Sequence, residues 1–281
     1  MNKNVLVSLT TIPRRAEGTS LIETIGHLLQ QDISCEILIN IPHEYRKWGA
    51  FELPSFLDGM PGITIHRPST DYGPATKLLG ALEYVRSRPE IDHIVTVDDD
   101  ICFQDTRHLR YLVTYARALP EHAVTVGGIR LKHEPYSSGD GLKYKNAFRY
   151  VDVPAGYKGV VYPVDKLGAS QLPFELKDGL IEGVFHDDDA YFGIVLSQLG
   201  VPLIAVPERL GVPRRSEARG GGVSGVQEKA TVDRRVNEGE IFRYARERNL
   251  IGSLSQRKML PMPVLRQALG VYLNWRTGRL K

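Results

Sequence analysis

Short apolar runs alternate along this chain with longer segments in which apolar residues recur every three or four positions. The runs have the length of β-strands and end at polar or turn residues; they cover residues 4–9, 36–41, 63–65, 93–97 and 123–126. The longer segments have the apolar spacing of amphipathic helices and lie near residues 21–29, 74–85, 106–119 and 187–199. This alternation predicts an α/β fold, with a mostly parallel central sheet flanked by helices.

Three further segments have weaker patterns. Residues 130–154 are polar and rich in tyrosine, which predicts loops or an antiparallel excursion. Residues 264–276 form an amphipathic stretch that either packs on the domain or lies on an anionic membrane. We expect residues 1–212 to form one domain, and residues 213–281 to form a flexible basic loop and a C-terminal helical extension packing on it.

The composition is that of an ordinary globular protein. Hydrophobic residues make up 42% and charged residues 25% of the 281 residues, which excludes a disordered or fibrous protein. No apolar run approaches the roughly 20 residues that span a bilayer. The two cysteines, Cys35 and Cys102, are too few for a disulfide framework and are interpreted as small core residues. These features predict a cytoplasmic protein, at most peripheral on the inner face of the cell membrane.

Charge is distributed unevenly along the chain. Residues 214–281 carry 15 Lys and Arg against 6 Asp and Glu, although the net charge of the whole chain is only +3. The remainder is therefore acidic, which argues against nucleic acid as a partner. A phosphate-bearing substrate or an anionic membrane surface fits this asymmetry better.

Asp98, Asp99 and Asp100 directly follow a predicted buried strand. Ligands of open α/β sheets bind at the carboxyl ends of strands. Side chains two residues apart on an extended backbone point to one side, so Asp98 and Asp100 are expected to converge on one ligand. Adjacent carboxylates favour a hard cation such as Mg²⁺ or Mn²⁺, bound together with phosphate oxygens. The alternative is a solvated acidic turn that caps the next helix.

Two other stretches contain candidate functional residues. In Asp71–Lys77, Pro74 suits a first helical turn, so Lys77 is placed to meet a diphosphate while Asp71 and Tyr72 hold a base or ribose; the alternative is a helix with a surface lysine. His186 precedes three acids, Asp187–Asp189, that open a predicted helix. Acids in a first turn need no further purpose, but a carboxylate near another acid has a raised pKa, which suits a general base.

The order of these motifs resembles that of GT-A-fold glycosyltransferases. Residues 95–101, VTVDDDI, resemble the "DxD" metal and nucleotide-sugar motif. Residues 188–193, DDAYFG, followed by Leu199-Gly200, resemble the "E-D-V-Y-x-G…L-G" segment of inverting galactosyl- and N-acetylglucosaminyltransferases. Residues 6–15, LVSLTTIPRR, together with residues 71–74, DYGP, look like bacterial surface-polysaccharide transferases.

The resemblance implies a role for each matching residue. It gives Asp189 as the catalytic base with Asp188 beside it, Asp100 as a ligand of Mn²⁺ or Mg²⁺, and Asp98 as a contact of the donor ribose or the metal. Together with the motifs above, it places the following residues at the nucleotide-sugar: Thr10, Thr11, Pro13, Arg14, Asp71, Tyr72, Lys77, Asp98, Asp99 and Gly159. Arg214 and Arg215, close to the glycines 220–222, are interpreted as phosphate-binding arginines of a mobile loop, and the alternative is a disordered basic linker. One departure is that no histidine follows His186, whereas many metal-dependent members have a late histidine ligand. Three alternatives follow: His186 is the substitute ligand, Asp100 and the diphosphate hold the metal together with water, or the enzyme depends only weakly on metal.

These implications lead to one main prediction and two alternatives. The main prediction is an inverting glycosyltransferase that moves a sugar from a nucleotide-diphosphate sugar, with a UDP-sugar expected, to a hydroxyl of a glycan or lipid-linked acceptor in bacterial surface-polysaccharide synthesis. One alternative is a sugar-phosphate nucleotidyltransferase, although the "GxGTR" loop typical of that class is replaced here by residues 10–15, TTIPRR. The other is a non-catalytic nucleotide-sugar or carbohydrate-binding protein, against which the second acid cluster counts.

Overall fold

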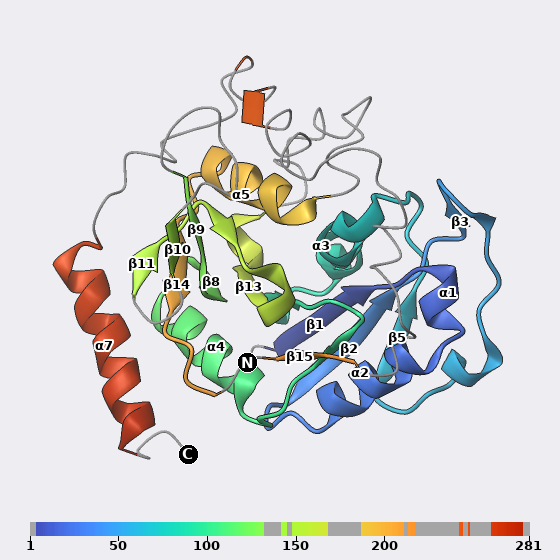
Figure 1. The fold of residues 1–281 in the computed structure, drawn as a ribbon, viewed down its shortest axis with the longest axis horizontal. Helices are drawn as coiled ribbons and strands as arrows, with labels where there is room; N and C mark the ends of the chain where they lie inside the picture. Colours follow the sequence, from blue (N-terminus) through green and yellow to red (C-terminus); the bar gives the residue numbers. More distant parts are fainter. Residues whose placement is uncertain are drawn as a thin grey trace.

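Figure 1 shows a central sheet covered by helices on both sides. The computed structural model describes residues 4–131, 142–144, 148–167, 187–210, 213–216, 242–243, 247 and 260–277. The sheet has eight strands in the order β11-β14-β8-β13-β6-β1-β2-β5. These are β1 (Asn4–Thr10), β2 (Cys35–Asn40), β5 (Ile63–His66), β6 (Ile91–Thr96), β8 (Ala123–Val126), β11 (Arg149–Tyr150), β13 (Val160–Pro163) and β14 (Leu203–Val206).

The strand directions confirm the predicted fold class. Strands β6, β1, β2 and β5 are parallel neighbours, and β8 and β14 form a second parallel pair. Strand β13 lies antiparallel between β6 and β8, and β11 lies antiparallel to β14 at the edge. The chain is therefore a mixed α/β protein with a mostly parallel sheet, and all five strands expected from the apolar runs belong to it.

Helices α2 (Thr19–Leu29) and α4 (His108–Ala118) cover one face of the sheet, whereas α3 (Thr76–Tyr84) and α5 (Asp188–Gln198) cover the other. Alternate strand residues supply the two cores. In β1, Leu6 packs with α3 and α5, while Val5 and Val7 pack with α2 and α4. The helical periodicity placed all four helices, but Leu29, expected on the apolar face of α2, is 49% exposed.

Several short elements surround this core. The β3–β4 hairpin (Glu44–Tyr45 and Gly49–Ala50) and helix α1 (Pro13–Ala16) lie in loops after β2 and β1. In the region expected to be loops or an antiparallel excursion, β9 (Gly128–Arg130) pairs antiparallel with β10 (Leu142–Tyr144) and β12 (Val153–Pro154). Single 3₁₀ turns are η1 (Ser55–Leu57), η2 (Gly73–Ala75), η3 (Val85–Ser87), η4 (Gly156–Lys158) and η5 (Val164–Lys166).

Two described pieces of the C-terminal region contact the rest of the chain. Strand β15 (Arg214–Arg215) pairs antiparallel with β7 (Ile101–Cys102), directly after the acidic motif. Helix α7 (Met262–Arg276) packs on α4, where the Trp275 ring lies 5.1 Å from Tyr111 and under the guanidinium of Arg110. None of the helices in the described ranges combines the length and the apolar character needed to cross a membrane.

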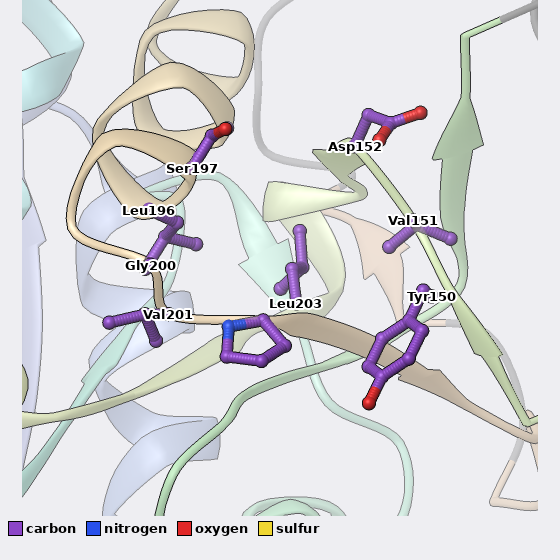
Figure 2. A pocket seen from close by; sticks show the side chains of 10 residues that line it. Tyr150, Val151, Asp152, Leu196, Ser197, Gly200, Val201 and Leu203 are labelled. Carbon is purple, nitrogen blue, oxygen red and sulfur yellow. The ribbon is translucent and has the colours of Figure 1, made fainter. Parts of the chain in front are cut away.

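The C-terminal end of α5 borders a small pocket over the start of β14. Figure 2 shows Leu196 and Ser197 of α5 facing Tyr150, Val151 and Asp152 across this pocket. Asp152 is buried, and its Oδ2 accepts a hydrogen bond of 2.7 Å from the backbone of Leu131. Burial raises the pKa of Asp152 to about 6, because the surroundings disfavour its charged form.

We expect Asp152→Asn to stabilise the protein at pH 8 and to leave it unchanged at pH 4. The folded-state pKa lies above the unfolded value, so the aspartate favours folding only at low pH and loses that contribution as pH rises from about 4 to 6. At one pKa unit per 1.36 kcal/mol, the gain at pH 8 is at most about 3 kcal/mol. Urea denaturation at both pH values measures the change in the free energy of unfolding, and Asp165→Asn, at an exposed position, is the control. An equal change at both pH values would contradict this origin.

Candidate functional site

The candidate site lies at the carboxyl edge of the parallel strands β1 and β6. Strand β6 ends at Thr96, and residues 97–100 form a turn beyond it. The loop after β1, the first turn of α3 and the first turn of α5 bring further polar side chains to the same turn. Open α/β sheets bind ligands at this edge, so the predicted location agrees with the general rule.

Lys77 forms the centre of one cluster. Its ammonium nitrogen lies 2.6 Å from Oδ1 of Asp98 and 2.8 Å from Oδ2 of Asp188. The side chain is buried because α3 packs against β1, where the Ser8 hydroxyl donates a 2.6 Å hydrogen bond to the Lys77 carbonyl. The sequence alone left a surface lysine as an alternative; the structure instead places the cation between two acid clusters.

The charges in this cluster depend on one another. Burial alone lowers the pKa of Lys77, but Asp188 and Asp98 more than offset it, so the pKa lies well above its ordinary value. Burial raises the pKa of Asp188 despite the opposing effect of Lys77. Burial and the neighbouring Asp188 raise the pKa of Asp189 well above its usual range. These shifts favour the charged form of Lys77 and disfavour the charged form of Asp189.

Asp189 lies close to the backbone of η4. The amide of Gly156 donates a 3.2 Å hydrogen bond to Oδ2 of Asp189. A Cβ atom at position 156 would lie 2.1 Å from Oδ1 of Asp189, so only glycine permits this approach. Asp187 caps the N-terminus of α5, the helix that carries Asp189, because its side chain accepts a hydrogen bond from the backbone amide of Ala190.

Arg15 forms the centre of a second cluster. It pairs with Oδ1 of Asp99 and lies 3.5 Å from Oδ2 of Asp100, while the Thr11 hydroxyl donates a 2.6 Å hydrogen bond to Asp99. Burial raises the pKa of Asp99, and Arg15 opposes that effect. Thr24 of α2 donates to the Asp99 carbonyl at 3.0 Å and so fixes the turn. The sequence analysis named Arg14 as a nucleotide-binding residue and did not name Arg15, which is the arginine that pairs with the acidic turn.

The structure separates two acids that were expected to converge. Asp98 turns to Lys77, whereas Asp99 and Asp100 share Arg15. The expectation assumed strand geometry, but the strand ends before Asp98, so the two-residue alternation no longer applies. The Asp98 side chain is 32% exposed and those of Asp99 and Asp100 only 5%, which makes Asp98 the acid most accessible to a ligand.

The Asp71 motif is held by local hydrogen bonds. Oδ1 of Asp71 accepts from the Gly73 amide at 2.8 Å, and Oδ2 accepts from the Arg46 amide at 2.9 Å. The Tyr72 amide donates to the Thr76 hydroxyl at 2.9 Å. Asp71 therefore shapes the turn that leads into α3; its contact with a base or ribose stays a prediction.

The other predicted binding residues are placed as follows. Thr10 joins β1 to β2 through a 2.8 Å hydrogen bond to the Asn40 carbonyl, Pro13 opens α1, and Arg14 is exposed. Gly159 has φ +91°, and a Cβ there would press on Leu112 of α4. The backbone conformation and the packing therefore already favour glycine at this position. Arg214 is exposed on β15, where Arg215 follows it in the strand. His186 lies outside the described residues.

The acidic motif does not by itself form a complete metal site. Within the described ranges, no group of three close Asp, Glu, His or Cys ligand atoms includes Asp98 or Asp100. Both carboxylates already pair with cations. They fit Mg²⁺ in the way that this ion is commonly held, by one or two carboxylates completed by substrate phosphates.

Comparison with known proteins finds similarity only at the level of structure. No protein-family model and no curated protein matches the sequence. A 4-diphosphocytidyl-2C-methyl-D-erythritol synthase is similar over 76% of this chain and 92% of its own, with 14% identity and a TM-score of 0.43. A CMP:2-keto-3-deoxy-manno-octonic acid synthetase complexed with CTP is similar over 77% and 94%, with 10% identity and a TM-score of 0.45.

These findings correct the functional prediction. At such identities and TM-scores the likeness describes the fold alone, and neither of these two proteins is named as a glycosyltransferase. The prediction of a glycosyltransferase with a UDP-sugar donor, a DxD motif and a glycan acceptor is therefore contradicted and is not carried further. The physical reason is that both glycosyltransferases and nucleotidyltransferases use acids at the carboxyl edge of a similar sheet, so short acidic motifs do not distinguish them.

Proposed function

We propose that this protein is a nucleotidyltransferase that joins the nucleotide part of a nucleoside triphosphate to a sugar phosphate. The observation that carries the proposal is Lys77, a buried cation held between Asp98 and Asp188 at the carboxyl edge of the sheet. A second cation, Arg15, lies on the other side of the acidic turn. Two fixed cations on either side of the acidic turn suit a substrate that carries several phosphates.

Binding would exchange the partners of both cations. Phosphate oxygens would replace Asp98 at Lys77 and Asp100 at Arg15. Asp98, the more exposed of the two released carboxylates, would hold Mg²⁺ together with phosphate oxygens, and the ion would neutralise the phosphates further. Asp188 would keep Lys77 oriented before and after binding, because Asp188 belongs to α5 and not to the acidic turn at residues 97–100.

The proposed reaction is an in-line displacement at the α-phosphorus. A phosphate oxygen of the sugar phosphate forms the new bond, the bond to the bridging oxygen of the β-phosphate breaks, and pyrophosphate leaves. Lys77 and Arg15 would neutralise the negative charge that gathers on the leaving group. An anionic nucleophile needs no base, so the general-base role that the glycosyltransferase resemblance gave to Asp189 has no place in this reaction.

The direct test is pyrophosphate release. Purified protein is incubated with Mg²⁺, one of CTP, UTP, ATP, GTP or dTTP, and a panel of sugar phosphates, and free sugars serve as matched controls without a phosphate. We expect release with one nucleotide in the presence of a sugar phosphate. Turnover of a nucleotide-diphosphate sugar without any nucleoside triphosphate would contradict the proposal.

Arg15 and Arg14 provide a matched pair on one short helix. We expect Arg15→Gln to weaken nucleoside triphosphate binding by about 10-fold or more, which is one charge-assisted hydrogen bond of about 1.5–3 kcal/mol. Arg14→Gln should change the dissociation constant much less, because Arg14 is exposed whereas Arg15 pairs with the acidic turn. Calorimetric titration measures both dissociation constants. If Arg14→Gln weakened binding more than Arg15→Gln, Arg14 rather than Arg15 would be the phosphate contact.

Asp189→Asn distinguishes the kind of acceptor. With a sugar phosphate as nucleophile we expect turnover to stay within about 10-fold of the unchanged protein, because the Asn side chain can still accept the Gly156 hydrogen bond. A loss of about 10²–10⁴-fold, the usual effect of removing a general base, would instead indicate a hydroxyl acceptor. Steady-state kinetics at saturating substrates separates these results.

A further inference from the structure

Three metal-ligand side chains meet outside the candidate functional site. They are Glu23 and His27 of α2 and Cys102 of β7, and one ligand atom from each lies within 4.8 Å of the other two. In the part of the chain that the structure describes, this is the one group of three such residues at this spacing. The proposed nucleotide chemistry uses none of them.

The fold brings the three side chains together from two directions. Glu23 and His27 are four residues apart on α2 and therefore lie on the same face of that helix. Strand β7 runs along α2 and is held there by its pairing with β15. Cys102 is buried, whereas Glu23 and His27 are partly exposed, so an ion can reach the group from solvent.

Neighbouring groups orient two of the three ligands. Nδ1 of His27 lies 3.2 Å from the carbonyl oxygen of Phe103, which suits a neutral ring that donates from Nδ1 and keeps a lone pair on Nε2. The Ser216 hydroxyl donates to Oε2 of Glu23. Metal-bound histidines and carboxylates commonly have such hydrogen-bonded partners, which fix the ring tautomer and the direction of the ligand.

We propose that Glu23, His27 and Cys102 bind Zn²⁺. A thiolate, an imidazole and a carboxylate together favour Zn²⁺ over the hard ions Mg²⁺ and Ca²⁺. As the sulfur–zinc bond forms, the Cys102 thiol gives its proton to solvent, and the two anionic ligands then balance the charge of the ion. Three protein ligands leave the fourth tetrahedral position to water.

The ion would connect this group to the acidic turn. Cys102 follows the turn by two residues, and the Ser216 amide donates a 2.8 Å hydrogen bond to the Asp100 carbonyl. Zinc bound to Glu23 and Cys102 would therefore hold α2, β7 and Ser216 in one arrangement. Because Zn²⁺ would bind only the folded chain, it should raise the melting temperature, and the rise should grow with the logarithm of the Zn²⁺ concentration above the dissociation constant.

The experiment uses the full chain, stripped with a chelator and titrated with Zn²⁺ and with Co²⁺. We expect one equivalent of Zn²⁺ to bind, and Co²⁺ to give the near-ultraviolet absorption band of a cobalt–thiolate bond, which Zn²⁺ then removes. Cys102→Ser should abolish the band. Losing an outer partner of a metal ligand costs about 10–100-fold in affinity, so losing the thiolate itself should weaken Zn²⁺ binding at least that much.

The second cysteine is the matched control. Cys35 lies on β2 and is not one of the three grouped side chains, and burial raises its pKa to about 11, so Cys35→Ser should keep both the cobalt band and the Zn²⁺ affinity. If Cys102→Ser does not fold, His27→Gln tests the same site, because it replaces a partly exposed ligand and should weaken Zn²⁺ binding. A cobalt band that persists in Cys102→Ser, Zn²⁺ affinity unchanged in His27→Gln, or equal competition by Mg²⁺ would each overturn the proposal.

Discussion

Lys77→Met is expected to lower the free energy of unfolding by about 3–5 kcal/mol, the usual cost of removing one partner from a buried ion pair. Methionine has a similar length but no charge, so Asp98 and Asp188 would lose the cation that lies within 2.8 Å of both. Nucleoside triphosphate binding should fall with it, because Lys77 is one of the two proposed phosphate contacts. Chemical denaturation and calorimetry measure the two effects separately.

The stability loss in Lys77→Met should depend on pH in a defined direction. Burial raises the pKa of Asp188 in the folded state, so this carboxyl favours folding at low pH and opposes it as pH rises through its folded pKa. Without Lys77 that pKa rises further, and the difference from the unchanged protein should be larger at pH 8 than at pH 5. Lys166→Met, which breaks a surface pair with Glu121, is the control and should change the free energy of unfolding far less than Lys77→Met. A loss that is the same at both pH values would contradict the ion-pair explanation.

Gly193→Ala is expected to be the second most damaging substitution. A Cβ at position 193 of α5 would lie 2.2 Å from the carbonyl oxygen of Asp152, an overlap with backbone rather than with a side chain that can turn away. Overpacking usually costs about 1–3 kcal/mol, and we expect the upper end of this range or more. Because α5 also carries Asp188, the affinity for nucleoside triphosphate should fall as the helix shifts.

Gly26→Ala is the matched control for this experiment. Gly26 is also inside a helix, but a Cβ there meets nothing within 4 Å. Alanine should therefore stabilise α2 by roughly 0.5–1 kcal/mol, the ordinary helix preference over glycine. Urea denaturation followed by circular dichroism compares both variants. If Gly193→Ala were as stable as Gly26→Ala, the close approach of α5 to residue 152 would be wrong.

The main elements of the fold could be predicted because their signals are local. Whether a residue in β1 faces one core or the other depends on the alternation of its own side chain, and the helices follow from apolar spacing within a few turns. The antiparallel position of β13 between β6 and β8 was not foreseen, because strand order depends on how distant segments pack.

The site could be predicted only in part, for a related reason. The carboxyl end of β6 and the first turn of α5 identified the acids, yet their partners come from elsewhere in the chain. Arg15 rather than Arg14 meets Asp99 because the short helix α1 turns that side chain inward. Asp98 and Asp100 pair with different cations because strand β6 ends before them, and the pattern of residues did not predict where the strand ends.

By itself the sequence determined the α/β class, the order of its main elements and the edge of the sheet at which the acids gather, because burial patterns and strand ends are properties of consecutive residues. Only the tertiary structure decided which charges meet. Lys77 reaches both acid clusters because α3 and α5 lie on the same face of the sheet. Cys102 joins Glu23 and His27 because β7 runs along α2. Such meetings depend on the packing of segments far apart in the chain, and the spacing of residues along it does not encode them.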